Sequence, residues 1–385
     1  MKQFKMSALN DNKNTNGTAT ALVVSTPGGP FEVQKVELKD LRPDEIIVRM
    51  VATGVCHTDF SSTNGTIPVP TPVIVGHEGS GVVEKVGSEV KHLAEGDHVL
   101  LSYPACTTCG PCLKGNPAYC VHGVRMSFGG CRLDGSVPFS KDGKDIHSFF
   151  NQSSFAHRSI VNQVCAVKID KSLPLDILCL LGCGIQTGAG TILNVLKPGI
   201  GSSVVVYGVG SVGLAGIMAA SKFTPATKII AVDINDKKLA FAEELGATHT
   251  INSRDQDVVK FIRDLTNGEG ANCAYDTTGV IKVVHDMIEA SAQNAVVASV
   301  GSAPQGSKVQ IELPEWIGRG MHFTGSCQGS SVPQLFIPAL IEFWKQGRFP
   351  VDRLIKRYHY TEINKAKDDL HHGDCVKGVL LWDSI

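Results

Sequence analysis

The feature that most constrains the fold is a glycine-rich motif between an apolar run and a run of small residues. The apolar run is 203–207 (SVVVY), the motif is 208–213 (GVGSVG), and 214–220 is small and apolar. A buried strand that turns through such a motif into a helix opens a dinucleotide-binding unit. With 40 glycines in the chain a chance match is easy, so the flanking strand and helix decide the interpretation. The motif therefore predicts a parallel sheet with crossover helices.

Each glycine of the motif has its own predicted task. Gly208 permits the tight turn, Gly210 lets backbone N–H groups approach a pyrophosphate, and Gly213 lets the helix pack on the strand. The next apolar run ends in Asp233, twenty residues after Gly213. A carboxylate there binds ribose hydroxyls and repels a 2′-phosphate, which favours NAD over NADP. The alternative for Asp233 is a helix N-cap, and Lys238 fits either a solvated helix charge or a neighbour of the ribose.

The pattern of polar, apolar and turn-forming residues changes along the chain. Residues 1–20 are polar and are predicted to form a flexible tail. From about 21 to 184, short β-like runs are broken by glycine and proline. From about 203 to 326, apolar runs alternate with helix-spaced segments such as 237–245 and 258–266, which is typical of a doubly wound α/β sheet.

Composition excludes several classes of function. The net charge of −1 gives no electrostatic reason to expect a nucleic-acid or membrane partner. No apolar run approaches the about 20 residues that span a bilayer, and the start lacks the apolar region of a signal peptide. The cytoplasm is the predicted location. Twelve cysteines in such a chain need an explanation other than disulfides.

Four of these cysteines are spaced C-x2-C-x2-C-x7-C within the predicted lobe 102–123. They are Cys106, Cys109, Cys112 and Cys120. Four thiolates in one compact loop close a tetrahedral shell, which suits a structural zinc ion. A [4Fe–4S] cluster motif starts in the same way but continues x3-C-P, whereas here the last gap is seven residues and valine follows. Two disulfides would satisfy the same count, but a cytoplasmic location disfavours them.

Three further fragments carry chemistry: CHTD at 56–59, GHE at 76–78 and GCG at 182–184. Taken singly, each fits an ordinary packed or surface residue, and spacing does not join them. In order along the chain, GVCHTDF, GHEGSGVVEKVGSEV, the four-cysteine lobe, GCGIQTGAG and GVGSVG resemble the zinc-dependent medium-chain alcohol dehydrogenases. Within that family, LSYPACTTCG, GNPAYC, FFNQSSFA and LLGCGIQTGAG are most similar to the aryl-alcohol (benzyl alcohol) branch.

The resemblance implies roles for residues at matching positions. Cys56, His77 and Cys183 match the three ligands of a catalytic zinc ion, a set for which alcohol dehydrogenase is the standard example. Thr58 matches the hydroxyl residue that starts the proton relay, and Asp59 and Glu78 match carboxylates behind the metal. Other matches lie against the coenzyme: His57 and Lys377 beside the pyrophosphate, Thr187 and Val212 beside the nicotinamide, and Val300.

Two positions carry further expectations. Several members of the family have a histidine five residues after the first zinc cysteine, and Ser61 stands there instead. Because serine is a poor general base, the proton must leave through water or another group. Ser102 matches a position that is often a bulky wall of the substrate pocket, so we expect it to leave room for a ring or an unsaturated chain. The six remaining cysteines are interpreted as packing residues.

The resemblance implies a mostly β, GroES-like catalytic domain over 21–184, completed by 327–385, and a Rossmann domain over 185–326. The predicted function is hydride transfer between a primary aryl or allylic alcohol and NAD, with two zinc ions per subunit, in a homodimer or homotetramer. Alternatives on the same scaffold are an aldehyde reductase of a biosynthetic pathway and a polyol or glutathione-adduct dehydrogenase. A non-catalytic NAD-binding or zinc-scaffold protein is disfavoured, since it has no need of an open metal position.

Overall fold

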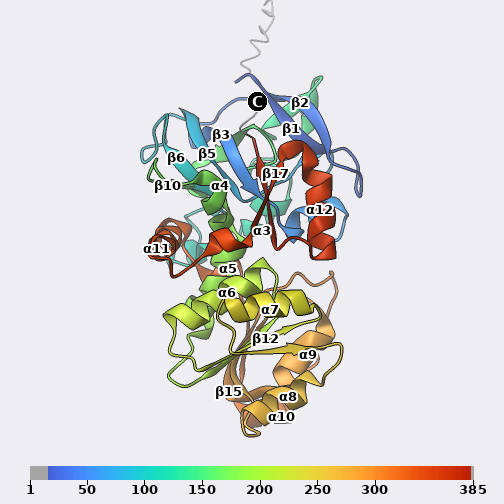
Figure 1. Cartoon of the computed structure of the whole chain (residues 1–385). Helices are drawn as coiled ribbons and strands as arrows, with labels where there is room; N and C mark the ends of the chain where they lie inside the picture. Colours follow the sequence, from blue (N-terminus) through green and yellow to red (C-terminus); the bar gives the residue numbers. More distant parts are fainter. Residues whose placement is uncertain (1–15, 383–385) are drawn as a thin grey trace, which may run out of the picture.

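The computed structural model describes residues 16–382, which form a β-rich part and a smaller part built on a parallel sheet (Figure 1). Of the predicted tail, residues 1–15 lie outside the described residues. The end of the tail was predicted wrongly, because strand β1 begins at Thr18. Thr18 and Ala19 pair with Glu37 and Val36 of the next strand, and the Ala19 side chain is buried. Pairing across a sheet, which polarity alone does not reveal, decides this boundary.

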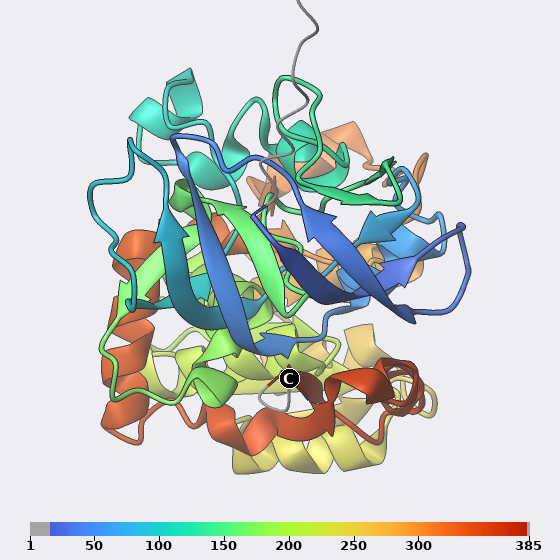
Figure 2. The ribbon, with the colours of Figure 1, turned by 90° about the horizontal axis from the view of Figure 1, so that it is seen from above.

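Two sheets build the β-rich part, whose strands lie in front of the parallel sheet when the molecule is viewed from above (Figure 2). One sheet has the order β4-β1-β2-β7-β8. Its strands are β1 (Thr18–Val24), β2 (Glu32–Leu38), β4 (Val73–Ile74), β7 (Phe139–Lys141) and β8 (Lys144–Ile146). The other sheet has the order β10-β6-β5-β3-β18-β17, with β9 pairing with β3. Its strands are β3 (Glu45–Gly54), β5 (Gly79–Val86), β6 (His98–Leu101), β9 (Arg158–Asn162), β10 (Ala166–Ile169), β17 (Ile355–His359) and β18 (Lys377–Leu381).

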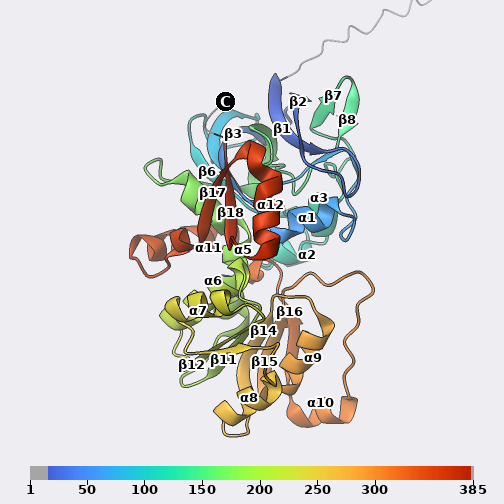
Figure 3. The ribbon, with the colours of Figure 1, turned by 45° about the vertical axis from the view of Figure 1, so that its right-hand side comes forward.

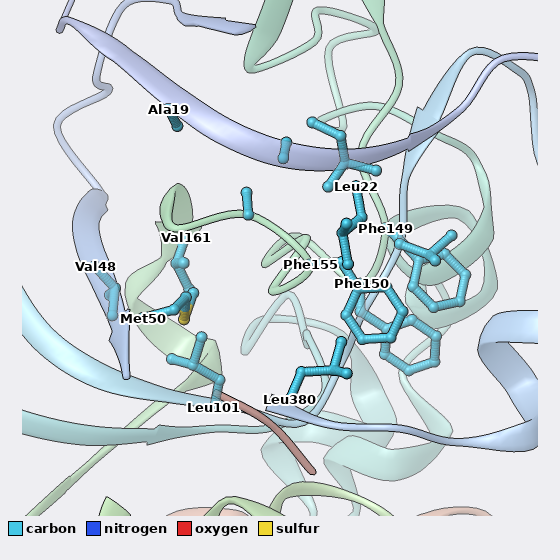
Figure 4. Packing of buried hydrophobic residues seen from close by; sticks show 14 of the residues in the cluster. Ala19, Leu22, Val48, Met50, Leu101, Phe149, Phe150, Phe155, Val161 and Leu380 are labelled. Atoms are coloured by element: carbon cyan, nitrogen blue, oxygen red, sulfur yellow. The ribbon is translucent and has the colours of Figure 1, made fainter. Parts of the chain in front are cut away.

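The core between these sheets is rich in aromatic side chains. Leu22 of β1 lies near Phe149, Phe150 and Phe155, and Leu380 of β18 closes the cluster from below (Figure 4). All five are buried, and each large apolar side chain removed from water contributes about 1.5–3 kcal/mol. Strand β18 is therefore part of the core of the N-terminal half. This core is complete only after the C-terminal segment has packed against it.

The second part is a six-stranded sheet whose neighbouring strands are all parallel, in the order β13-β12-β11-β14-β15-β16. Its strands are β11 (Ser203–Tyr207), β12 (Lys228–Asp233), β13 (His249–Asn252), β14 (Ala271–Asp276), β15 (Ser291–Ser299) and β16 (His322–Gly325). The helices between them are α6 (Ser211–Phe223), α7 (Asp236–Glu244), α8 (Val258–Leu265), α9 (Ile281–Glu289) and α10 (Leu313–Arg319). The order reverses at β11, between β12 and β14, and this is the point where open α/β sheets bind ligands. The predicted α/β class is confirmed.

The remaining helices lie around the β-rich part and at its junction with the parallel sheet. They are α1 (His57–Thr63), α2 (Gly110–Leu113), α3 (Gly123–Phe128), α4 (Leu175–Leu178), α5 (Gly184–Gly190), α11 (Pro333–Lys345) and α12 (Ile363–His372). Helix α5 packs on α6 between the two parts, and α12 covers β17 and β18 (Figure 3). Within residues 16–382 no single helix is long and apolar enough to cross a bilayer; a helix pair bent by 55° meets those criteria only when its two halves are counted together.

Candidate functional site

Four potential ligand atoms meet at the base of the junction between the two parts. They belong to Cys56, His77, Glu78 and Cys183, and all lie within 4.8 Å of one another. Cys56 is the N-cap of α1, His77 and Glu78 precede β5, and Cys183 precedes α5. Three separate elements therefore deliver the cluster, and this is why spacing along the chain could not join its members.

The histidine of this cluster is held in one orientation and leaves one nitrogen without a partner. His77 Nδ1 lies 2.8 Å from Asp59 Oδ1, and Asp59 also accepts the backbone N–H groups of Cys56 and Gly76. The His77 ring stacks on Phe150 with centroids 4.6 Å apart. His77 Nε2 is buried without a hydrogen-bond partner, which is costly unless a ligand satisfies it. A carboxylate behind a histidine is the arrangement that orients metal-binding histidines.

The pKa shifts of the two thiols in the cluster also indicate a site for a cation. The pKa values of Cys56 and Cys183 shift in opposite directions, because hydrogen bonding between the two groups lowers the pKa of Cys56 and raises that of Cys183. Zinc replaces the thiol protons and stabilises both sulfurs as thiolates. Cys56, His77 and Cys183 thus fit a zinc ion with one position left for a substrate.

Glu78, the fourth member of the cluster, forms an ion pair with Lys377. Both side chains of the Glu78–Lys377 pair are buried, and Lys377 Nζ lies 2.7 Å from Oε1 and 2.6 Å from Oε2 of Glu78. Glu78 Oε1 also accepts the backbone N–H of Gly184 at 3.2 Å. Lys377, predicted to lie beside a pyrophosphate, is only 1 % exposed and is paired with Glu78, and its contact with a coenzyme stays a prediction.

The four cysteines of the lobe also converge. The sulfurs of Cys106, Cys109, Cys112 and Cys120 lie within 4.8 Å of one another. Burial acts to raise the pKa of Cys106, but backbone N–H groups of Thr108 and Cys109 outweigh it and lower that pKa to about 6. Burial raises the pKa of Cys112 to about 12. Four thiols so close together carry full charge only around a cation, and their closed shell fits a structural zinc ion.

A cleft of about 440 Å³ runs from the first cluster to the glycine motif. We call it the junction cleft. The predicted residues that line it are Cys56, His57, Thr58, Ser61, Gly208, Gly210, Val212, Asp233, Lys238 and Val300. Gly213 lies behind it, where a Cβ would be 2.0 Å from the Gly208 carbonyl oxygen, so close packing requires a glycine there. Thr187 is buried one turn after Cys183 on α5 and does not line the cleft.

Comparisons with known proteins identify the family to which this chain belongs. Residues 42–168 match the alcohol dehydrogenase GroES-like domain, and residues 211–345 match the zinc-binding dehydrogenase domain. A geraniol dehydrogenase from Castellaniella defragrans is 38% identical over 368 residues, which cover 95% of this chain and 98% of that protein. The chain is a zinc-dependent medium-chain alcohol dehydrogenase.

Two further relatives of this alcohol dehydrogenase are informative. The crystal structure of benzyl alcohol dehydrogenase from Acinetobacter calcoaceticus superimposes with a TM-score of 0.91 at 39% identity, over 94% of this chain and 99% of that one. An S-(hydroxymethyl)glutathione dehydrogenase from Paracoccus denitrificans is 33% identical, over 94% of this chain and 99% of the relative. The predicted family, fold class, enzyme class and zinc requirement are confirmed.

The structure excludes the alternative role of Asp233 and contradicts the expectation for Ser102. Asp233 is not a helix N-cap, because Asn235 caps α7; Asp233 instead accepts backbone N–H groups of Val209, Ile234 and Asn235 at 2.8–3.0 Å. Ser102 is not an open pocket wall. Its side chain is fully buried, and its hydroxyl donates to the Gly182 carbonyl at 2.7 Å.

Two glutamines near the ligands were not expected from the sequence. Gln186 of α5 donates to Ser102 Oγ and to the Gly182 carbonyl, both at 2.6 Å. Gln328 Nε2 lies 3.6 Å from Cys183 Sγ. Gln186 lies in the quoted GCGIQTGAG motif, where a long polar side chain among small residues was an available signal. Gln328 had no such signal, because it lies 145 residues from the sulfur that it contacts.

Proposed function

We propose that this alcohol dehydrogenase transfers hydride between a primary aryl or allylic alcohol and NAD. The observation that carries the proposal is the junction cleft itself. It places Cys56 and Thr58, beside the catalytic cluster, on the same cavity as Gly208 and Gly210 of the dinucleotide motif. A substrate at the cluster and a nicotinamide over Val212 would then share one enclosed space, which hydride transfer requires.

The residues of the chain divide the work of such a reaction. Cys56, His77 and Cys183 hold zinc, and Asp59 fixes the tautomer of His77. Bound zinc makes an alcohol more acidic and polarises an aldehyde carbonyl. Thr58 Oγ1 lies 3.6 Å from Cys56 Sγ and on the cleft, where it takes the alcohol proton. Ser61 lines the same cleft but does not act as a base, so the proton continues to solvent through water.

The preference for NAD rests on Asp233. Its carboxylate lies at the end of β12 beside the cleft and has no cation among its hydrogen-bond partners in the described chain. A 2′-phosphate would meet this negative charge, whereas ribose hydroxyls would donate to it. His57 and Lys238, which also line the cleft, supply positive or donor groups for the rest of the dinucleotide.

The substrate class rests on the relatives. Geraniol and benzyl alcohol both carry the hydroxyl on a carbon next to an unsaturated group, and dehydrogenases named for them are 38% and 39% identical to this chain. The second candidate is a glutathione adduct, because two S-(hydroxymethyl)glutathione dehydrogenases are 33% and 35% identical. An aldehyde reductase would use the same site in the opposite direction.

We also propose a homodimer or homotetramer in the cytoplasm. Strand β16 ends the parallel sheet with an unpaired edge, and Leu313 and Ile317 of α10 are exposed beside that sheet. None of the twelve cysteines forms a disulfide, which agrees with a reducing compartment. Light scattering measured at several concentrations tests the assembly, since a monomer throughout would refute it.

A substrate panel tests the main proposal. The purified protein is given NAD, or NADP, with benzyl alcohol, geraniol, ethanol, sorbitol or S-(hydroxymethyl)glutathione, and absorbance of the reduced coenzyme is recorded. We expect kcat/KM to be highest for benzyl alcohol or geraniol with NAD, and to fall after treatment with a zinc chelator. A preference for the glutathione adduct would support the second candidate instead. No chelator-sensitive activity with any alcohol would refute both.

A further inference from the structure

A turn with unusual backbone geometry passes beside the catalytic cluster. It is the segment Gln328–Ser330, which follows β16, and its three residues have φ values of 50°, 63° and 47°. Left-handed backbone is unfavourable for a residue other than glycine, because the Cβ atom approaches the following carbonyl oxygen, and Gln328 and Ser330 both adopt it. Such a conformation persists only where its surroundings hold it in place.

Several elements hold this turn. The Tyr119 hydroxyl from the four-cysteine lobe lies 2.7 Å from Ser330 Oγ and donates to the Gly325 carbonyl at 3.1 Å. Asn194 donates to the Gly329 carbonyl at 3.0 Å. Gly329 itself packs so closely on α5 that a Cβ there would be 2.4 Å from a backbone carbonyl oxygen. The turn is therefore fixed against both the lobe and α5.

The fixed turn places the Gln328 amide in one orientation. Gln186 Nε2 donates to the Gly182 carbonyl, which only accepts, and this partner determines which end of the Gln186 amide carries the N–H groups. Gln186 uses its two N–H groups on that carbonyl and on Ser102 Oγ, and its Nε2 also lies 3.3 Å from Gln328 Oε1. With its oxygen on the side of Gln186, Gln328 directs Nε2 toward Cys183 Sγ, 3.6 Å away.

We propose that Gln328 is a positioning residue, which donates a hydrogen bond to the Cys183 sulfur and so weakens the electron donation of that sulfur to the catalytic zinc ion. The inference rests on the proposed role of Cys183 as a ligand. An N–H group on a ligating thiolate draws electron density away from the metal, as hydrogen bonds around cysteine ligands do in other metal sites. The metal is then a stronger acid toward the alcohol. The four-cysteine lobe contributes to this effect through Tyr119, which braces the turn.

Cobalt substitution measures this effect directly. Wild type, Gln328→Leu and Tyr119→Phe are loaded with Co²⁺ at the catalytic site alone, with zinc kept in the four-cysteine lobe, and the sulfur-to-cobalt charge-transfer band is recorded. Without the N–H group, the sulfur electrons lie higher in energy, so we expect the band to move to longer wavelength in Gln328→Leu. Tyr119→Phe removes one hydroxyl and should shift the band in the same direction by less. Gln334→Leu, on the exposed face of α11, is the matched control and should leave the band unchanged.

Kinetics give a second readout. For Gln328→Leu we expect kcat for alcohol oxidation to fall about 10-fold near neutral pH. The loss should shrink at higher pH, where a weaker metal acid still releases the proton, and KM for NAD should not change. A variant that had only lost structure would lose activity at every pH and would not move the cobalt band.

Cys183→Ser separates this inference from the function on which it rests. If Cys183→Ser keeps both zinc ions and an unaltered cobalt band, Cys183 is not a ligand and the proposed catalytic site is wrong. If Cys183→Ser weakens and shifts the band, leaving the contribution of Cys56, but Gln328→Leu and Tyr119→Phe do not move it, the catalytic site stands and the role of Gln328 is refuted.

Discussion

The Lys377 ammonium lies 2.7 Å from one carboxylate oxygen of Glu78 and 2.6 Å from the other, and both side chains are almost completely buried. The two residues are 299 positions apart in the chain. Their pairing joins strand β18 to the segment that carries His77, at the Glu78 member of the cluster. Burial acts to lower the pKa of Lys377, but the charge of Glu78 outweighs it and keeps the lysine protonated.

Breaking this pair should destabilise the protein strongly. Lys377→Met leaves the Glu78 charge buried without a partner, and we expect the free energy of unfolding to fall by about 3–5 kcal/mol. Urea denaturation of the zinc-loaded protein measures it. The double variant Lys377→Met/Glu78→Gln removes both charges and should recover part of the loss. If the double variant is less stable than Lys377→Met, the pair does not act as a unit.

The choice of coenzyme should change at Asp233. Asp233→Ser removes the charge that repels a 2′-phosphate, so we expect KM for NAD to rise and kcat/KM for NADP to improve. The effect on the ratio of the two kcat/KM values should be at least about 10-fold, since one hydrogen bond to a charged group contributes about 1.5–3 kcal/mol. Asp236→Ser, at the exposed start of α7, serves as the control. An unchanged ratio in Asp233→Ser would assign coenzyme choice to other residues.

Removal of zinc from the lobe should expose thiols of unequal reactivity. Because only a thiolate attacks a maleimide, Cys106, with its pKa lowered to about 6, should be labelled at pH 7 before Cys112, whose pKa is raised to about 12. The labelling rate of Cys106 should rise through about pH 6 and then level off. Peptide mapping by mass spectrometry after chelation measures both. Faster labelling of Cys112 would contradict the assignment.

The proton route depends on the Thr58 hydroxyl. In Thr58→Val, which keeps the shape and removes the hydroxyl, we expect kcat for alcohol oxidation to fall about 10²–10⁴-fold. Thr58→Ser keeps the hydroxyl and should keep most of the activity, and Ser61→Ala should do the same because serine is a poor base. A normal pH profile and kcat in Thr58→Val would place the first proton acceptor elsewhere.

Ser102→Phe should act on stability and not on substrate choice. The serine is fully buried between the Gly182 carbonyl and Gln186, so a phenyl ring has no space to enter. We expect a loss of about 1–3 kcal/mol in the free energy of unfolding from overpacking. Thermal unfolding, measured beside the benzyl alcohol to ethanol activity ratio, distinguishes the two outcomes. A stable protein with an altered ratio would restore Ser102 to the pocket wall.

Local patterns in the sequence determined the dinucleotide-binding motif and the four-cysteine lobe. The glycine motif after an apolar run and the cysteine spacing of the lobe act over a few residues, so they were readable without a structure. Asp233 at the end of the next strand belongs to the same class, because strand and turn fix its position. The family resemblance added the order of the fragments around Cys56, His77 and Cys183, and the structure brings these three together.

Only the tertiary structure decided the contacts between distant segments. It buried Ser102, paired Lys377 with Glu78, and extended β1 to Thr18. It also brought Gln328 to Cys183 from 145 residues away. The physical reason is common to all four. Burial, ion pairing and strand pairing depend on which segments meet after the chain folds, whereas turns and ligand spacings depend on residues that are already neighbours in the chain.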